Sequence, residues 1–190
     1  MSWKYDYFYI KDFFSKKEII NLNKFIDKNY QEIEKLEDVS IDMSTGKSKK
    51  KTKSLLIEYK KIKLKLKHLE ENVKEINEKL LGYELYNIKD TTNCILNIYD
   101  HKIKGEYGWH TDNSRSDIYD CKLTVLINLS QTEYKGGDFY LMNGNEYIVP
   151  EFQKPGSVII IKSFFNHKVT PVLSGERRTL ALFLFGPKFR

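Results

Sequence analysis

Two histidines and one aspartate in the second half of the chain have the types and spacing of a metal site. His110 and Asp112 are two residues apart, so on an extended strand both side chains leave the same face. His167 is distant in sequence and can complete a triad only if a second strand comes alongside. Two imidazoles and one carboxylate leave half of an octahedral metal open, which suits iron(II) with a co-substrate and oxygen.

An arginine follows the last histidine of the triad. Arg177 lies ten positions after His167, and its planar guanidinium can pair with a carboxylate through two parallel hydrogen bonds. Zinc is the rival metal, because the same ligands bind it well and it outranks iron in intrinsic affinity. A zinc hydrolase would not need the arginine, so iron is preferred.

Together with several glycine and proline motifs, these residues resemble the Fe(II)/2-oxoglutarate-dependent dioxygenases, and within them the prolyl 4-hydroxylase-like group. The resemblance covers roughly residues 92 to 187. Its motifs are, in chain order, Tyr99 and Gly105, Tyr107 to Asp112, the apolar run Leu123 to Leu129, Gly136-Gly137-Asp138-Phe139, Pro155-Gly156-Ser157, His167 to Val172, and Gly175 to Leu180. It implies Fe(II), 2-oxoglutarate and O2, with ascorbate as an optional addition, and a peptide or protein substrate.

The resemblance also implies roles for further residues. Arg177 and Thr179 alternate on the last strand and share a face, where they would hold the distal carboxylate of 2-oxoglutarate. Tyr99 would help to bind that carboxylate, although a core aromatic is an equal alternative. Arg178 points to the other face and is expected to be a surface charge. Asn128 stands where relatives often carry another tyrosine.

Three residues beside the metal motif are candidates for substrate binding, namely Trp109, Tyr107 and Arg115. Aromatic and arginine side chains often anchor peptides, but ordinary packing beside the triad is the alternative for the two aromatic residues. Gly136 and Gly137 are expected to provide a tight turn or a close backbone approach. The predicted activity is hydroxylation of a peptidyl proline to 4-hydroxyproline, with release of succinate and CO2. The alternatives are a nucleic-acid base demethylase of the same chemistry and a non-catalytic jelly-roll binding module.

Composition indicates a folded globular chain. Its 190 residues are 41% hydrophobic and 14% aromatic, which predicts one domain over residues 1–190. The net charge of +6 is concentrated between Lys47 and Lys67 and does not by itself indicate a nucleic-acid partner. The sequence has neither a membrane-length apolar run nor a signal-peptide pattern, so we expect a cytoplasmic protein without a membrane partner. Cys94 and Cys121 are expected to be buried thiols.

The elements that must position these residues change in character along the chain. Residues 1–82 are expected to form a helical amino-terminal support. Tyr5 to Ile10 is an aromatic strand candidate, and Ser15 to Glu18 matches a capping box that opens a helix through Ile26. Asp38 to Lys53 is polar and predicts a mobile loop, a candidate substrate lid. A second helix follows, with an apolar stripe that ends at a Gly82 cap, and its members are Ile62, Leu66, Leu69, Val73, Ile76 and Leu80.

Residues 83–190 are expected to form the jelly-roll core. Short β-type runs alternate with turn residues, and they are Cys94–Tyr99, Leu123–Leu129, Asp138–Met142, Tyr147–Val149, Val158–Lys162, Lys168–Val172 and Thr179–Phe185. Helices first and strands afterwards indicate an α+β, mainly β fold. The predicted architecture is a double-stranded β-helix, or jelly roll, with the amino-terminal helices packed on one sheet.

Overall fold

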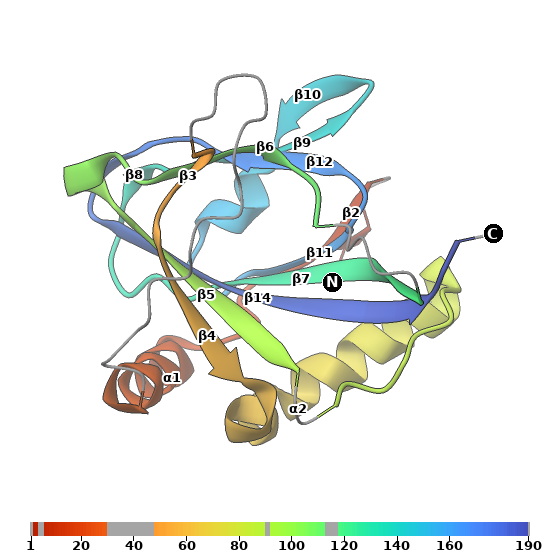
Figure 1. The fold of residues 1–190 in the computed structure, drawn as a ribbon. Helices are drawn as coiled ribbons and strands as arrows, with labels where there is room; N and C mark the ends of the chain where they lie inside the picture. Colours follow the sequence, from red (N-terminus) through yellow and green to blue (C-terminus); the bar gives the residue numbers. More distant parts are fainter. Residues whose placement is uncertain (1, 4–5, 30–47, 90–91, 113–117, 190) are drawn as a thin grey trace.

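A computed structural model describes residues 2–3, 6–29, 48–89, 92–112 and 118–189 of the chain (Figure 1). The helical elements are α1 (Lys16–Asn29), α2 (Tyr59–Ile76), the π-helical turn η1 (Asn77–Leu81), and the 3-10 turns η2 (His101–Ile103) and η3 (Pro150–Gln153). The strands are β1 (Ser2–Trp3), β2 (Tyr7–Ile10), β3 (Lys50–Lys51), β4 (Lys53–Glu58), β5 (Asn93–Asp100), β6 (Glu106–His110), β7 (Tyr119–Asn128), β8 (Lys135–Gly136), β9 (Phe139–Asn143), β10 (Asn145–Ile148), β11 (Val158–Lys162), β12 (Asn166–Val169), β13 (Val172–Ser174) and β14 (Glu176–Pro187).

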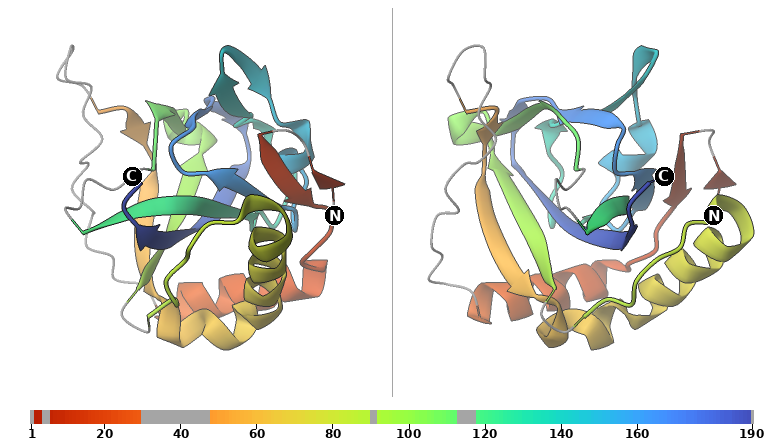
Figure 2. Two further views of the ribbon diagram at one scale, coloured as in Figure 1. Left: turned by 90° about the vertical axis from the view of Figure 1, so that its right-hand side faces the viewer. Right: turned by 45° about the vertical axis from the view of Figure 1, so that its right-hand side comes forward.

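Two antiparallel sheets face each other and enclose the centre of the molecule. The larger has the strand order β1-β2-β11-β7-β14-β5-β4, and the smaller has the order β10-β9-β12-β6-β3. Figure 1 shows the smaller sheet above the larger one, and Figure 2 shows the strands curving around the interior between them. A two-stranded ribbon of β8 and β13 completes the described strands. The predicted jelly roll is therefore confirmed.

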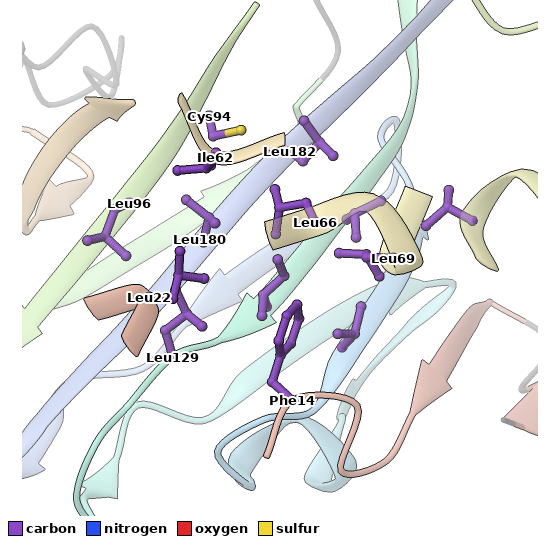
Figure 3. Packing of buried hydrophobic residues seen from close by; sticks show 14 of the residues in the cluster. Phe14, Leu22, Ile62, Leu66, Leu69, Cys94, Leu96, Leu129, Leu180 and Leu182 are labelled. Carbon is purple, nitrogen blue, oxygen red and sulfur yellow. The ribbon is translucent and has the colours of Figure 1, made fainter. Parts of the chain in front are cut away.

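Both long helices cover the outer face of the larger sheet (Figure 1). Helix α1 begins after the predicted capping box, in which the Ser15 N–H donates to Glu18 Oε2 at 2.8 Å and the Glu18 N–H donates to Ser15 Oγ at 3.3 Å. The stripe on α2 buries Ile62, Leu66 and Leu69 completely. Figure 3 shows these side chains packed against residues of the sheet, among them Leu96, Leu180 and Leu182. Burial of each such side chain contributes about 1.5–3 kcal/mol of transfer free energy.

The end of the second helix differs slightly from the predicted one. Regular α-helix stops at Ile76, and the last turn is π-helical up to Leu81. Gly82 then ends the helix in the left-handed conformation at φ 68°, as the predicted cap requires. Leu80, the last member of the predicted stripe, is 51% exposed because the wider π-helical turn rotates it away from the sheet.

Two boundary predictions are corrected by the structure. The polar composition of Asp38–Lys53 predicts a loop, but its last residues form β3, which pairs with β6, and the first residue of β4, which pairs with β5. Residues 30–47, which contain the rest of that loop, lie outside the described residues. The predicted strand Lys168–Val172 is two strands, because Pro171 has no N–H to donate to a ladder.

A second hydrophobic core fills the space between the sheets and borders the functional residues described below. Cys94 and Cys121 are buried free thiols, as predicted. Among the described helices, none has both the length and the apolar character that crossing a membrane requires.

Candidate active site

The two histidines of the predicted triad lie opposite each other on neighbouring antiparallel strands. His110 ends β6 and pairs in register with His167 of β12. Asp112 follows just beyond β6, where its N–H donates to the Ser163 carbonyl at 2.9 Å. Nε2 of His167 lies 3.3 Å from Asp112 Oδ2, and Nε2 of His110 lies 3.7 Å from Asp112 Oδ1. Ligand atoms of all three residues lie within 4.8 Å of one another, so one ion can bind them together.

A β-bulge in β6 turns two of its side chains into the cavity. Gly108 and Trp109 of β6 lie opposite the single Lys168 of β12. The extra residue offsets the two-residue alternation of a strand, so residues three apart face the same side. Tyr107 therefore stacks on the imidazole of His110, with ring centroids 3.5 Å apart and ring planes 9° apart.

Backbone carbonyl groups orient both imidazoles. Nδ1 of His110 lies 2.8 Å from the Gly108 oxygen, and Nδ1 of His167 lies 3.0 Å from the Phe165 oxygen. These distances assign the ring proton to Nδ1, which donates to the carbonyl. When the imidazole is neutral, its Nε2 then carries the lone pair that can coordinate a metal, which is the usual arrangement around histidine ligands.

The three side chains also share charge. Burial raises the pKa of the Asp112 carboxyl, but the His167 imidazolium and a 2.8 Å hydrogen bond from Thr124 Oγ1 outweigh burial and lower it. Burial lowers the pKa of His167, yet the Asp112 carboxylate outweighs that effect and raises it. Burial and the nearby His167 charge lower the pKa of His110 to about 3. In the metal-free triad these shifts favour an imidazolium at His167 beside the Asp112 carboxylate and a neutral imidazole at His110.

Arg177 is a buried cation with unused hydrogen-bond donors. Its side chain is among the largest fully buried ones, and the residue is 1% exposed. Its guanidinium carbon lies 5.2 Å from the ring centroid of Tyr99 and 5.1 Å from that of Phe152. Nη1 donates to Thr179 Oγ1 at 2.6 Å. Within the described part of the chain, Nε and Nη2 have no hydrogen-bond partner.

The triad, Arg177, Thr179 and Tyr99 line one cavity of about 110 Å³. A buried cation with two orphaned donors is costly, so an acceptor group is expected to occupy the space beside it. Nε and Nη2 are on one edge of the guanidinium, and a carboxylate can accept from both. The residues therefore fit a metal ion together with a carboxylate-bearing co-substrate.

The neighbouring Arg178 is not the surface charge that the sequence predicted. It is 6% exposed, and its Nη1 and Nη2 donate to the Asp27 carboxylate of α1 at 3.3 and 2.6 Å. The prediction was wrong because helix α1 covers this face of β14. The alternation itself holds, since Arg177 and Arg178 point to opposite sides of the sheet.

The predicted substrate residues are separated. Tyr107 lines the cavity. Trp109 lies beside Lys168, whose Nζ is 4.4 Å from the centre of the indole ring, on the opposite face of the smaller sheet. Arg115 lies outside the described residues. Tyr99 is 2% exposed, and burial raises the pKa of its hydroxyl, so the side chain remains a neutral hydrogen-bonding group.

Two residues beside the site, one lining the cavity and one packed on Arg177, were not identified from the sequence. Lys50 of β3 lines the cavity, with Nζ 5.0 Å from the ring centroid of Tyr107. Phe152, which flanks Arg177, is in the short turn η3. Neither lies in an element long enough to show periodicity, although the proline that begins η3 is a turn signal.

Asn128 holds the turn that carries Phe152. It is the register partner of Thr179, and its side-chain amide donates to the carbonyl groups of Phe152 and Gln153 at 2.8 and 3.2 Å. The amide also lies 3.0 Å from the hydroxyl of Tyr134. Asn128 therefore anchors the turn whose Phe152 ring flanks the guanidinium of Arg177.

A facial set of two histidines and one carboxylate, with a cavity on its open side, is typical of a non-haem Fe(II) oxygenase. The family model of the 2OG-Fe(II) oxygenase superfamily matches residues 94–185. Over these residues the chain is similar to the 2OG-Fe(II) oxygenases, and prolyl hydroxylases are among its structural neighbours.

Individual relatives agree with this assignment. The chain is 38% identical over 73 residues to a PKHD-type hydroxylase of Synechococcus sp. (strain CC9605), a match that covers 37% of this chain and 32% of that protein. It thus spans about a third of that relative's length. Among solved structures, a Pseudomonas putida prolyl-4-hydroxylase superposes with a TM-score of 0.69 at 16% identity, covering 97% of this chain and 94% of that one. A Trichoplax adhaerens prolyl hydroxylase in complex with a hypoxia-inducible-factor peptide gives 0.65 at 17% identity, covering 95% and 83%. At these identities the structural likeness establishes the fold.

Proposed function

We propose that the protein is an Fe(II)- and 2-oxoglutarate-dependent dioxygenase that hydroxylates a peptidyl substrate, at proline to give 4-hydroxyproline. The single observation that carries the proposal is the pair of orphaned guanidinium donors of Arg177 in the same cavity as the triad. A non-catalytic binding module would need neither feature. A base demethylase would share both, and the net charge of +6 is the observation in its favour.

Each residue of the site has a defined task in this reaction. His110, Asp112 and His167 hold the iron; backbone carbonyl groups keep the two imidazoles aimed at it, and Thr124 fixes the Asp112 carboxylate. Nε and Nη2 of Arg177 bind the distal carboxylate of 2-oxoglutarate, next to the hydroxyls of Thr179 and Tyr99. When bound, iron and 2-oxoglutarate supply the oxidation, which yields succinate, CO2 and a hydroxylated substrate.

The surrounding side chains exclude water and orient the reactants. Tyr107 covers one face of His110, while Phe139 and Leu126 provide apolar walls. A water-poor cavity strengthens the charge pairing of Arg177 with its ligand. Tyr107, at the cavity wall, is the side chain best placed to contact the substrate, and a role in substrate binding for Trp109 and Arg115 is not part of the proposal.

A peptidyl proline is supported by the kind of relatives found. The structural neighbours include a prolyl-4-hydroxylase and a prolyl hydroxylase with a bound peptide. The basic stretch that would favour nucleic acid is partly neutralised, because Lys60 and Lys61 lie 2.6 and 3.5 Å from the Glu58 carboxylate. A peptide therefore remains the preferred partner.

Succinate formation tests the proposal. The protein with Fe(II), 2-oxoglutarate and O2, with and without ascorbate, is incubated with a proline-rich peptide, a methylated oligonucleotide or neither. We expect peptide-stimulated succinate with a matching gain of one oxygen atom on proline, and none with His167→Ala. Stimulation by the oligonucleotide alone would favour the demethylase. Iron and 2-oxoglutarate binding without any succinate would favour a binding module.

A further inference from the structure

The outer face of the smaller sheet carries a cation enclosed by aromatic rings directly behind the metal ligands. Nζ of Lys168 lies 4.4 Å from the ring centroid of Trp109 and 4.7 Å from that of Tyr140. The same atom forms a 2.9 Å ion pair with Glu146. The Lys168 side chain is only 23% exposed. One ammonium group therefore joins β6, β12, β9 and β10, which Figure 1 shows side by side.

The cluster of Lys168, Trp109, Tyr140 and Glu146 lies at the β-bulge of β6, beside two metal ligands. Lys168 is the residue that faces the bulge, and Trp109 is one of the two bulged residues. Trp109 immediately precedes His110 in the chain, and Lys168 immediately follows His167. At a bulge the extra residue leaves the ladder unpaired, so backbone hydrogen bonds alone fix the register weakly there. A slip of one residue would turn His110 away from the cavity.

We propose that Lys168 is a positioning residue, which clamps Trp109 and Tyr140 on the outer face and so keeps the bulge at Gly108–Trp109. The clamp keeps Nε2 of His110 on the same side as that of His167. Lys168 contacts neither the metal nor the substrate. The inference rests on the proposed metal site, and it explains why Trp109 packs away from the cavity.

A cation between two rings is a stronger restraint than a solvated surface lysine. Cation–π contacts are favourable when the cation is partly desolvated, and the Glu146 carboxylate fixes the third side of the ammonium. Lys65 supplies a matched control, because its Nζ lies 5.3 Å from the ring centroid of Phe25 between the two helices, far from the bulge. Both lysines make a cation–π contact, but only Lys168 can affect the register of the metal ligands.

Titration with Co(II), which reports its ligand field by visible absorption, tests the clamp without turnover. Lys168→Met keeps most of the aliphatic stem but loses the charge, and it should weaken Co(II) binding on the order of tenfold. The visible d–d bands of Co(II) bound to Lys168→Met at saturation should differ from those of Co(II) bound to the wild type. Lys168→Arg should restore both, and Lys65→Met should match the wild type. Lys168→Met with wild-type affinity and bands overturns the proposal.

Two further measurements keep the result interpretable. Circular dichroism and the urea midpoint separate a general loss of stability from a local change in the ligand field. If Lys168→Met does not fold, Tyr140→Leu removes one ring of the clamp from an adjacent strand, and it should shift Co(II) binding in the same direction; unchanged binding there overturns the clamp. Wild-type protein that binds no Co(II), or binding that survives in His110→Ala, contradicts the metal site itself and not the clamp.

Discussion

Thr179 accepts a 2.6 Å hydrogen bond from Nη1 of Arg177, two positions earlier on the same face of β14. This bond holds the guanidinium plane in place while Tyr99 and Phe152 flank it. Because Thr179 uses one edge of the guanidinium, the edge formed by Nε and Nη2 is left for a ligand. The pair therefore preorganises a fork for one carboxylate before that carboxylate arrives.

Replacement of Arg177 should act on the co-substrate far more than on the metal. We expect Arg177→Ala to raise the 2-oxoglutarate requirement on the order of a hundredfold, if ~3 kcal/mol is lost with the charged partner. Arg177→Lys should recover part of this loss, because lysine supplies charge without the fork. Co-substrate affinity by calorimetry and metal affinity by Co(II) titration are the measurements. Equal losses of both affinities would contradict the assignment.

Arg178 provides the comparison on the opposite face. Arg178→Ala removes the bidentate contact to Asp27, so it should lower the free energy of unfolding but leave 2-oxoglutarate affinity nearly unchanged. If Arg178→Ala weakened 2-oxoglutarate binding more than Arg177→Ala does, the register assigned to β14 would be wrong by one residue.

Gly137 should be required for the position of Arg177. A β-carbon at this residue would lie 2.9 Å from Arg177 Cδ and 2.9 Å from Val172 Cγ2, at a φ of 63°. Gly137→Ala should therefore displace the arginine and weaken 2-oxoglutarate binding severalfold. Gly144→Ala is the control, because its φ of 77° imposes comparable backbone strain with no atom within 4 Å. Calorimetry on both variants decides, and equal affinities would refute the steric argument.

Features that depend on residue spacing could be predicted from the sequence. Features that depend on tertiary packing could not. The alternation of Arg177 and Thr179 and the stripe on α2 follow from strand and helix periods, so both could be derived. The loop-like composition of residues 48–53 concealed β3 and the start of β4, because an edge strand is often charged. Lys50 was missed for that reason.

The position of the bulge in β6 could not be predicted from the sequence. Gly108 is a weak signal of a bulge inside a strand, but the extra residue is defined only by its pairing with Lys168 on a distant strand. Likewise, the spacing predicts a surface charge at Arg178, because only the packing of α1 supplies its partner Asp27. The polar lid predicted over Asp38–Lys53 stays a prediction for residues outside the described ranges.

His167 should be indispensable for metal binding. His167→Ala removes one of three ligands, and three are the minimum that anchors iron while leaving three positions free. We expect loss of Co(II) or Fe(II) binding and of both coupled and uncoupled 2-oxoglutarate decarboxylation. His68→Ala, at a side chain that is 88% exposed on α2, is the control and should behave as wild type. Survival of iron affinity together with uncoupled decarboxylation would show that the triad is wrongly assigned.

Metal binding should strengthen as the pH rises through the pKa of His167. The Asp112 carboxylate raises this pKa despite the opposing effect of burial. The stability that the His167–Asp112 pair gives the metal-free protein is therefore present below the ordinary pKa of about 6.5 and is lost as the pH rises through the folded value. A metal binds only the neutral imidazole. The affinity for metal should therefore rise with pH, by about tenfold per pH unit below the folded pKa of His167.

The proton that the metal displaces should come from His167 and not from His110, whose pKa is lowered to about 3 by burial and by the His167 charge. His110 is consequently neutral throughout this range. Calorimetric titration with Co(II) in buffers of different ionisation enthalpy counts the protons released at each pH. We expect release of about one proton below the raised pKa of His167, falling towards zero above it. Release of two protons near neutral pH would mean that both imidazoles are charged in the metal-free protein, and pH-independent binding would contradict the His167–Asp112 pair.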